Sequence, residues 1–401
     1  MMVLGAQVAW AQGLSLDQAL AAALAQHPDL RASQMESEAA GAATQQAAAW
    51  QNPELATLVE DTRRATRSTT IQLNQPVELG GKREARLGVA RAAEGAADVE
   101  AAVRRAQVGA DLRLAFHAAA VAQERVRLSE ELARLATQAR EGADRRVQAG
   151  KVSPVEALKA QVAEAQALSA VAVAQGEQRA TVARLRQAMG EPTELATSTK
   201  ALVVEADLAR LPSADRWRPL PLQLSASPLV AQAQQEVSRR QALAEVERAR
   251  RTPDLTVSLG ARRDAEAGRN QAILGVSWVL PLFDRNQGAI VEASRREDKA
   301  RIDSEALRAR IGAQAEQALS QLSSALVQAQ TLRERVLPAA RQAFAASTRG
   351  FELGKFGFLD VLDAQRTLFE AETQALSAAA QAFEADAHLH ALLGEPTPTK
   401  D

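Results

Sequence analysis

The stretch "LGKFGFLDVLDAQ", Leu353–Gln365, has a near copy 204 positions earlier, "AGKVSPVEALKAQ" at Ala149–Gln161. In each copy a glycine is followed by a lysine and then by a helix-forming run. Glycine at such a position is typical of a tight turn that ends one helix and begins the next. Two turns of one design, so far apart in a single polypeptide, indicate a duplicated helical hairpin.

Three further pairs of segments keep the same order with a spacing of about 200 residues. They are "NPEL" and "TPDL", "QPVEL" and "LPLFD", and "MGEP" and "LGEP". A long unit repeated only twice does not suit a solenoid, whose units are much shorter. The sequence therefore predicts two tandem repeats, residues 12–190 and 229–401. A linker with five prolines, residues 191–228, joins them.

The composition favours long helices over a thick globular core. The 401 residues are 46% hydrophobic, but much of this is alanine, aromatic residues make up 3%, and tyrosine is absent. Alanine favours helices and buries little area, so such helices must pack closely. The net charge of −1 argues against nucleic acid as a partner. The absence of cysteine excludes disulfides, thiolate metal sites and a cysteine-linked lipid anchor.

The N-terminus reads as a secretory signal. Residues 1–11 contain a short apolar run that ends in Ala9-Trp10-Ala11, an A-x-A-type cleavage site. An ordinary apolar N-terminus is the alternative interpretation. No later stretch reaches the roughly 18 apolar residues that a spanning helix needs. If the mature chain crosses a membrane, strands that close a barrel must do so.

Each repeat contains the same series of elements. A helical segment, from Ser15 to about Trp50 in the first repeat, precedes two short strands with alternating polarity. The predicted strands span about 53–61, 68–77, 253–261 and 270–282. Charged loops, "EDTRRATRS" and "RRDAEAGRN", join each pair. Strands of about ten alternating residues match tilted transmembrane strands. A soluble sandwich or an edge hairpin remains open, and four strands cannot close a barrel without other chains.

A very long helical hairpin follows each pair of strands. Residues 82–148 contain no proline, and nearly seventy helical residues would extend roughly 100 Å. Apolar residues recur every seven positions, which predicts lengthwise coiled-coil packing: Leu114, Val121, Leu128 and Leu135, then Leu362, Phe369, Leu376 and Phe383. Gly150 should end the first long helix, and Ser153 should cap the next. Pro338 should bend the second long helix.

The tip motifs, together with "QPVELGGKREAR" at residues 75–86, resemble the TolC-like outer-membrane efflux family. The "ELGGKR" portion is similar to its CzcC-like heavy-metal export branch. The resemblance covers nearly the whole chain after the signal. It implies a mainly α fold with a small β part, in which each repeat pairs a long α-helical coiled-coil hairpin with a two-stranded β-hairpin. It further implies a homotrimer with a 12-stranded transmembrane β-barrel and a periplasmic α-helical tube.

The resemblance also implies partners and sites. The partners are an inner-membrane pump, a periplasmic adaptor (membrane fusion protein) and outer-membrane lipid. The family's tip turns, which contact the adaptor, match Gly150, Lys151, Val152 and Ser153, and Gly354, Lys355, Phe356 and Gly357. Asp360 and Asp363 match the acidic constriction, so a trimer would gather six carboxylates into a periplasmic gate. The alternative is that acidic residues in a first turn simply complement the helix dipole.

No enzyme motif, cofactor site or metal site is predicted. The chain has no G-x-S-x-G, Walker A or zincin motif. His388 and His390 lack the i, i+3 or i, i+4 spacing of helical metal ligands, so a surface position at the end of the last helix is expected. A duct for drugs or for type I protein secretion is the alternative to metal export. A soluble periplasmic coiled-coil scaffold is the second alternative, although it leaves the paired strands unexplained.

Overall fold

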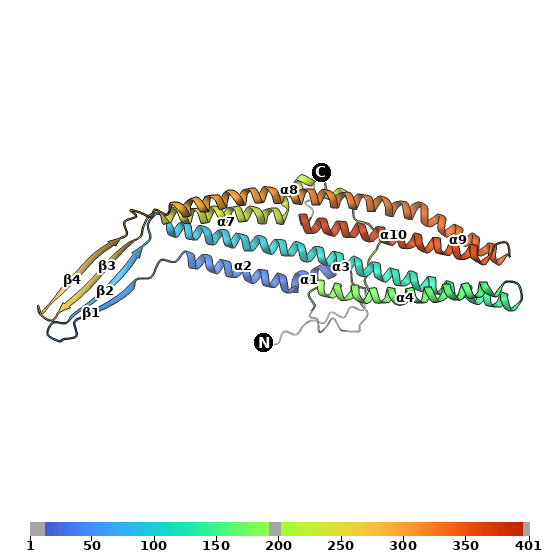
Figure 1. The fold of residues 1–401 in the computed structure, drawn as a ribbon, viewed down its shortest axis with the longest axis horizontal. Helices are drawn as coiled ribbons and strands as arrows, with labels where there is room; N and C mark the ends of the chain where they lie inside the picture. Colours follow the sequence, from blue (N-terminus) through green and yellow to red (C-terminus); the bar gives the residue numbers. More distant parts are fainter. Residues whose placement is uncertain (1–12, 192–201, 396–401) are drawn as a thin grey trace. The chain divides into compact units, whose positions relative to one another are not determined.

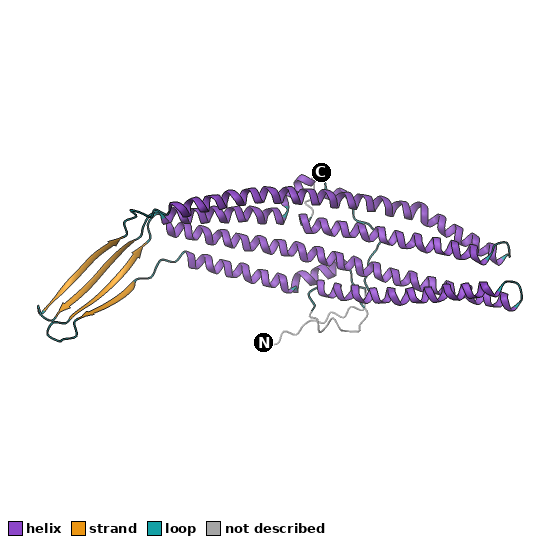
Figure 2. Cartoon of the chain, in the orientation of Figure 1, coloured by secondary structure: helices purple, strands orange, loops and turns teal. Residues whose placement is uncertain are grey.

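The computed structural model describes residues 13–191 and 202–395. The predicted signal, residues 1–11, and residues 192–201 of the predicted linker lie outside these ranges. The described chain is mostly helical with one small antiparallel sheet (Figure 2). The first half contains α1 (Leu16–Gln26), α2 (Pro28–Ala47), β1 (Glu54–Glu60), β2 (Ser68–Val77), α3 (Lys82–Gln148) and α4 (Pro154–Ala188) (Figure 1).

The second half repeats this series after a short connecting region. That region contains the 3-10 turn η1 (Asp215–Trp217) and α6 (Leu220–Ala226). The repeated elements are α7 (Pro228–Arg250), β3 (Leu255–Asp264), β4 (Arg269–Trp278), α8 (Gln287–Thr331), the π-turn η2 (Leu332–Val336), α9 (Leu337–Glu352) and α10 (Phe358–Leu393). β4 ends at Trp278 rather than near residue 282, where Pro281 would lack the amide that a ladder needs.

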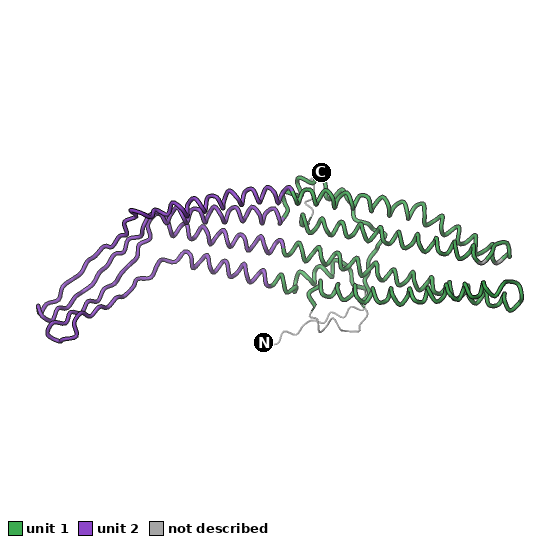
Figure 3. The backbone as a smooth tube through the Cα atoms, viewed as in Figure 1, with its two compact units in different colours: residues 1–31, 104–227, 310–401 green, residues 32–103, 228–309 purple. Residues whose placement is uncertain are grey.

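The chain divides into two compact units that cut across the repeats (Figure 3). One unit contains residues 1–31, 104–227 and 310–401, and the other contains residues 32–103 and 228–309. Each unit therefore combines corresponding parts of both repeats. The second unit carries the sheet, and the first carries both hairpin tips.

The four strands form one sheet in the order β1-β2-β3-β4, all antiparallel. Its register places one leucine of every strand in a single row, Leu55, Leu73, Leu259 and Leu274. The next row pairs Asn74 with Ser258, whose hydroxyl donates to the Asn74 Oδ1 at 2.8 Å. Because side chains alternate between faces, the sheet has one apolar face and one polar face.

The heptad positions bring helices of different repeats together. Val121 and Leu128 of α3 are buried in one cluster with Leu376 of α10, and Phe369 packs against it. This confirms the predicted lengthwise packing for these positions. Leu114 departs from the pattern because its side chain is 43% exposed. The heptad spacing therefore does not predict burial at Leu114, although Leu112 and Phe116 on either side of it are buried.

Two proline positions shape the helices. The predicted segment from Ser15 to Trp50 is two helices, since Pro28 begins α2 and the preceding His27 is extended. Ser15 caps α1, accepting from the Gln18 amide at 3.3 Å as expected. Pro338 lies in the first turn of α9, directly after the π-turn η2. The chain accommodates this proline by changing helical hydrogen bonding just before it.

Among the helices of residues 13–191 and 202–395, none is both long and apolar enough to span a bilayer.

Candidate functional site

The first hairpin tip closes with the hydrogen bonds of a Schellman turn. Gly150 has φ +68°, and its amide donates to the Val147 carbonyl at 2.9 Å. The amide of Lys151 donates to the Arg146 carbonyl at 2.9 Å. A residue with a Cβ is strained at this φ, so glycine suits the position. Ser153 then caps α4, as predicted, by accepting from the Val155 amide at 3.3 Å.

The second tip repeats this geometry residue for residue. Gly354 has φ +73°, and its amide donates to the Phe351 carbonyl at 3.0 Å. The amide of Lys355 donates to the Gly350 carbonyl at 2.8 Å. The duplicated sequence motif is thus a duplicated backbone structure, and both predicted turns lie in the same compact unit.

The aromatic side chain of the second tip folds back over its own helix. A Cβ added to Gly350 would lie 2.1 Å from the Phe356 ring, so only glycine leaves room for this contact. Phe356 nevertheless remains 48% exposed, and the neighbouring Leu353 is 64% exposed. The tip therefore presents apolar surface that its own hairpin does not cover.

Asp360 and Asp363 are both exposed on the first turns of α10. The Oδ2 of Asp360 accepts from the Gly357 amide at 2.8 Å, which is the helix-capping use of an acidic residue at this position. The side chain of Asp363 has no hydrogen bond or ion pair with any described residue. The capping alternative thus accounts for Asp360, while Asp363 stays available for another role.

One contact that the sequence did not reveal connects the two hairpins near their tips. The Arg146 guanidinium lies 3.8 Å from the centroid of the Phe351 ring and donates to the Phe351 carbonyl at 2.9 Å. Phe351 also packs, together with Leu362, against the buried Ala143 and Ala160. Arg146 corresponds in the repeat to Gly350, so the duplicated motif gave no sign of its role.

The last helix holds a buried polar network that contradicts the expected surface position of the histidine pair. His388 is exposed, but only 3% of His390 is exposed. His390 Nε2 lies 3.3 Å from the Arg216 guanidinium. Asp386 accepts from the Trp217 indole at 2.9 Å and pairs with Arg216. Residues two apart in a helix point to nearly opposite sides, which explains the different environments.

Burial, followed by the charges of Arg113 and Arg216, lowers the pKa of His390 to about 3. Burial and the charge of Arg113 likewise lower the pKa of His117 to about 4. Both imidazoles are therefore neutral near pH 7. His117 stacks on Phe383 with 3.8 Å between ring centroids. His117 thus packs α3 against α10, and His390 packs α10 against η1.

The sheet is the second candidate site, because its faces differ so strongly. On the apolar face Leu55, Leu259, Leu274 and Val276 are all at least 62% exposed. Polar side chains bond to one another on the opposite face, where the Gln72 Nε2 donates to the Asn74 Oδ1 at 2.8 Å. An exposed apolar face of this extent marks a surface that contacts lipid or protein.

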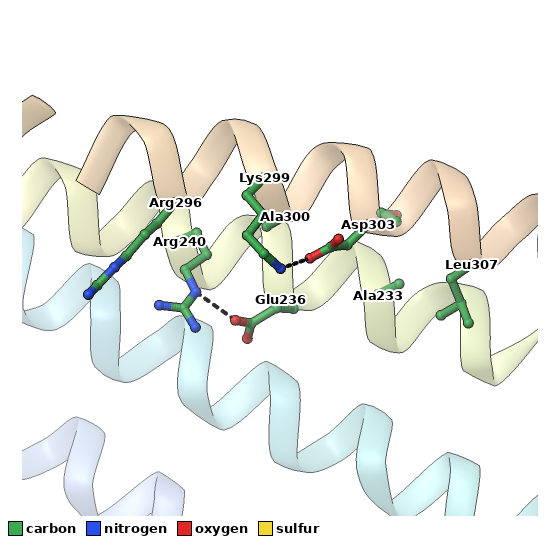
Figure 4. Close-up of a pocket in the computed structure, with 9 residues that line it drawn as sticks. Ala233, Glu236, Arg240, Arg296, Lys299, Ala300, Asp303 and Leu307 are labelled. Carbon is green, nitrogen blue, oxygen red and sulfur yellow. Dashed lines mark hydrogen bonds and ion pairs between the residues drawn. The ribbon is translucent and has the colours of Figure 1, made fainter. Parts of the chain in front are cut away.

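A groove of about 550 Å³ between α7 and α8 does not qualify as a binding site (Figure 4). Arg240 pairs with Glu236 at 2.7 Å, and Lys299 pairs with Asp303. Arg296, the remaining charged residue that lines it, pairs with Glu292. Every charge in the groove is thus already matched. No cluster of three or more His, Asp or Glu side chains suited to a metal occurs in the described ranges.

The arrangement of paired hairpins and shared sheet agrees with comparisons to known proteins. Residues 19–191 and 220–395 match the family model of outer membrane efflux proteins. The chain belongs to this family. Its place is accordingly the outer membrane, from which it extends into the periplasm. The soluble scaffold alternative is excluded.

Two relatives show where the chain lies within the family. It is 44% identical to the cobalt-zinc-cadmium resistance protein CzcC of Cupriavidus metallidurans, over 95% of this chain and 90% of CzcC. It is 30% identical to the nickel-cobalt-cadmium resistance protein NccC of Alcaligenes xylosoxydans, over 75% of this chain and 68% of NccC.

Solved structures show the same tandem-repeat fold. The CusC channel matches with a TM-score of 0.78 at 17% identity, over 94% of this chain and 92% of CusC. The MtrE outer membrane channel of Neisseria gonorrhoeae matches with a TM-score of 0.78 at 17% identity, over 94% of this chain and 88% of MtrE.

Proposed function

We propose that three copies of this efflux protein form the outer-membrane conduit of a tripartite system that exports divalent heavy-metal cations. Each copy would give its four strands to a shared 12-stranded barrel and its two hairpins to a periplasmic tube. Residues 12–190 and 229–401 would be the duplicated modules, joined by residues 191–228. A periplasmic adaptor and an inner-membrane pump would supply the cargo, and the conduit itself would act passively, without catalysis.

The observation that carries this proposal is the sheet. Its apolar face suits lipid hydrocarbon, and its polar face suits a water-filled lumen. β1 and β4 are edge strands with no further partner among the described strands. Unpaired backbone groups are costly in hydrocarbon, so such edges require neighbouring strands. Sister copies, which carry the same two edges, satisfy this requirement by closing a ring.

The cargo is inferred from the relatives. CzcC and NccC are named for resistance to cobalt, cadmium, and either zinc or nickel. A ring of Asp360 and Asp363 from three copies would favour cations over anions at the mouth of the tube. In this ring Asp363 supplies the carboxylates that no described group engages, while Asp360 also holds the turn. The first repeat would contribute little, since it carries Glu156 and Lys159 instead.

The tips are proposed to contact the adaptor. In the first repeat the contact would comprise Gly150, Lys151, Val152 and Ser153, and in the second Gly354, Lys355, Phe356 and Gly357. The exposed Phe356 ring and the exposed Lys355 are the side chains best placed to meet a partner. Replacing both with alanine should weaken crosslinking to the adaptor in cells. Unchanged crosslinking with full export would remove this role.

The proposal is tested by metal accumulation in cells that express the cognate pump and adaptor but lack this gene. Restoring the full chain should lower cellular cobalt, zinc or cadmium, and the extracted particle should have three times the chain mass. Unchanged metal content, with the particle correctly assembled, would contradict metal export but not the conduit. Lowered accumulation of a drug alone would assign the conduit to drug efflux.

A further inference from the structure

The two hairpin loops of the sheet carry charges that the conduit proposal does not explain. The loop between β1 and β2 and the turn between β3 and β4 lie together, since the Ala265 amide donates to the Arg67 carbonyl at 3.1 Å. Residues 60–67 and 262–269 contain six arginines and four acidic residues. By connectivity, these loops lie at the end of the sheet opposite to the helices.

The acidic residues of these loops are mostly engaged within the loops themselves. Asp61 accepts from the Thr66 hydroxyl at 2.5 Å and from the Arg63 amide at 3.0 Å. Asp264 accepts from the amides of Glu266 and Ala267, each at 3.0 Å. The bond from Thr66, followed by that from the Arg63 amide, lowers the pKa of Asp61, so this carboxylate stays ionised.

The arginines, in contrast, have few partners. Among the residues that the structure describes, only Arg262 has a carboxylate within ion-pair distance, that of Glu60 at 3.3 Å. The other five are exposed, and their guanidinium groups have no hydrogen bond or ion pair within the described ranges: Arg63, Arg64, Arg67, Arg263 and Arg269. The register places Arg263 two residues beyond Ala261 on the apolar face. The positively charged Arg263 therefore lies at the loop end of the apolar face.

Aromatic residues show the opposite distribution along the sheet. Trp278 ends β4 on the helix side and is 58% exposed, and Phe283 follows at 94% exposed. The loop side carries no aromatic residue in residues 54–77 or 255–275. Transmembrane sheets usually have aromatic girdles at both interfaces. Here one interface has aromatic residues and the other has guanidinium groups.

We propose that this arginine cluster binds the phosphate groups of the phosphorylated glycolipid that forms the outer leaflet. This inference rests on the proposed orientation of the sheet in the outer membrane. Guanidinium groups match phosphate oxygens with paired hydrogen bonds, which lysine cannot reproduce. The cluster would fix the depth of the sheet in the leaflet, as aromatic residues do at the other end. The hydrogen bonds that Asp61 and Asp264 accept within the loops also leave these two carboxylates less able to pair with the neighbouring guanidinium groups, which stay available for phosphate.

The test uses the full chain, purified in detergent, and titrates it with diphosphoryl lipid A in mixed micelles. A variant with Arg63, Arg64, Arg263 and Arg269 changed to Gln should bind about tenfold more weakly, the size expected when four exposed charge pairs are lost. The matched control changes four other exposed arginines to Gln and should stay within about twofold of the parent: Arg251, Arg285, Arg308 and Arg310.

A lysine variant and other lipids test whether the binding is phosphate recognition by arginine. The same four loop arginines changed to lysine should give an intermediate loss, and dephosphorylated lipid A should bind no better than a neutral lipid. Equal loss in both glutamine variants, or equally tight binding of phosphatidylglycerol by the parent chain, would overturn the proposal. If the fourfold variant does not assemble, R63Q/R64Q, which leaves every strand intact, should still weaken binding about threefold.

Channel conductance, measured on the same samples, separates the two proposals. Normal conductance with no preference for lipid A would reject the arginine site alone. Absence of both conductance and membrane insertion would reject the conduit as well.

Discussion

Arg146 is predicted to hold the two hairpins together near their tips, and replacing it with Gln should loosen them. The guanidinium makes a charged hydrogen bond to the Phe351 carbonyl and lies on the Phe351 ring. A hydrogen bond to a charged group contributes about 1.5–3 kcal/mol, and an exposed cation–π contact about 0.5–1 kcal/mol. Arg146 is only half-buried. A total of about 2 kcal/mol is therefore expected, which corresponds to roughly a 30-fold change in an equilibrium.

Amide hydrogen exchange of the tips measures this change. In R146Q the peptides that cover residues 337–357 should exchange about 30-fold faster, because opening of the hairpins becomes easier. Arg145→Gln is the control: Arg145 is exposed, and the only ion pair found for it among the described residues is to Glu141, at 4.0 Å. A double-mutant cycle with Phe351→Leu should show coupling of about 0.5–1 kcal/mol from the ring contact. Equal exchange in R146Q and R145Q would refute the clamp.

Three further predictions follow from the tips and the buried network. D360N/D363N should reduce the preference of single channels for cations over anions, and selectivity identical to the parent would remove the proposed gate. Gly354→Ala should lower the unfolding free energy by about 1 kcal/mol through backbone strain alone. Gly350→Ala should lower it further, because the added methyl group clashes with the aromatic ring of the turn. Equal shifts in the thermal unfolding temperature of the two variants would contradict this. Because the pKa of His390 is lowered to about 3, the contribution of its neutral form to the unfolding free energy is fully present above about pH 6.5. This contribution is lost as the pH decreases toward about 3. Acid titration of unfolding should show a shallower loss in His390→Gln, and an unchanged slope would exclude this histidine.

The sequence predicted the features that depend on local chemistry. Gly150 and Gly354 ended helices because a turn with positive φ favours glycine, and the alternation around Leu259 marked a two-faced strand. The heptads also identified Val121 and Leu128 as core positions. These patterns are short-range, so one chain is enough to read them.

Features that depend on distant partners could not be read in this way. In the sequence Arg146 resembles any other arginine at the end of a helix, because its partner Phe351 lies 205 positions later. His390 is buried because Arg216 and Trp217 pack against the last helix. No pattern near His390 in the sequence predicts these contacts. Leu114 had the right spacing for the heptad but is 43% exposed, whereas the neighbouring Leu112 and Phe116 are buried. Long-range packing decides such positions.

Disulfide scanning across the sheet edges tests whether β1 of one copy pairs with β4 of the next, because the native chain contains no cysteine. One cysteine replaces Thr57 on β1, and a second replaces Ala272, Leu274 or Val276 on β4 in turn. These strands lie at opposite edges of the sheet in one copy. If three copies close a ring through these strands, covalently linked three-chain species should form at one register. Monomers alone at every register, in a folded and membrane-inserted protein, would contradict it.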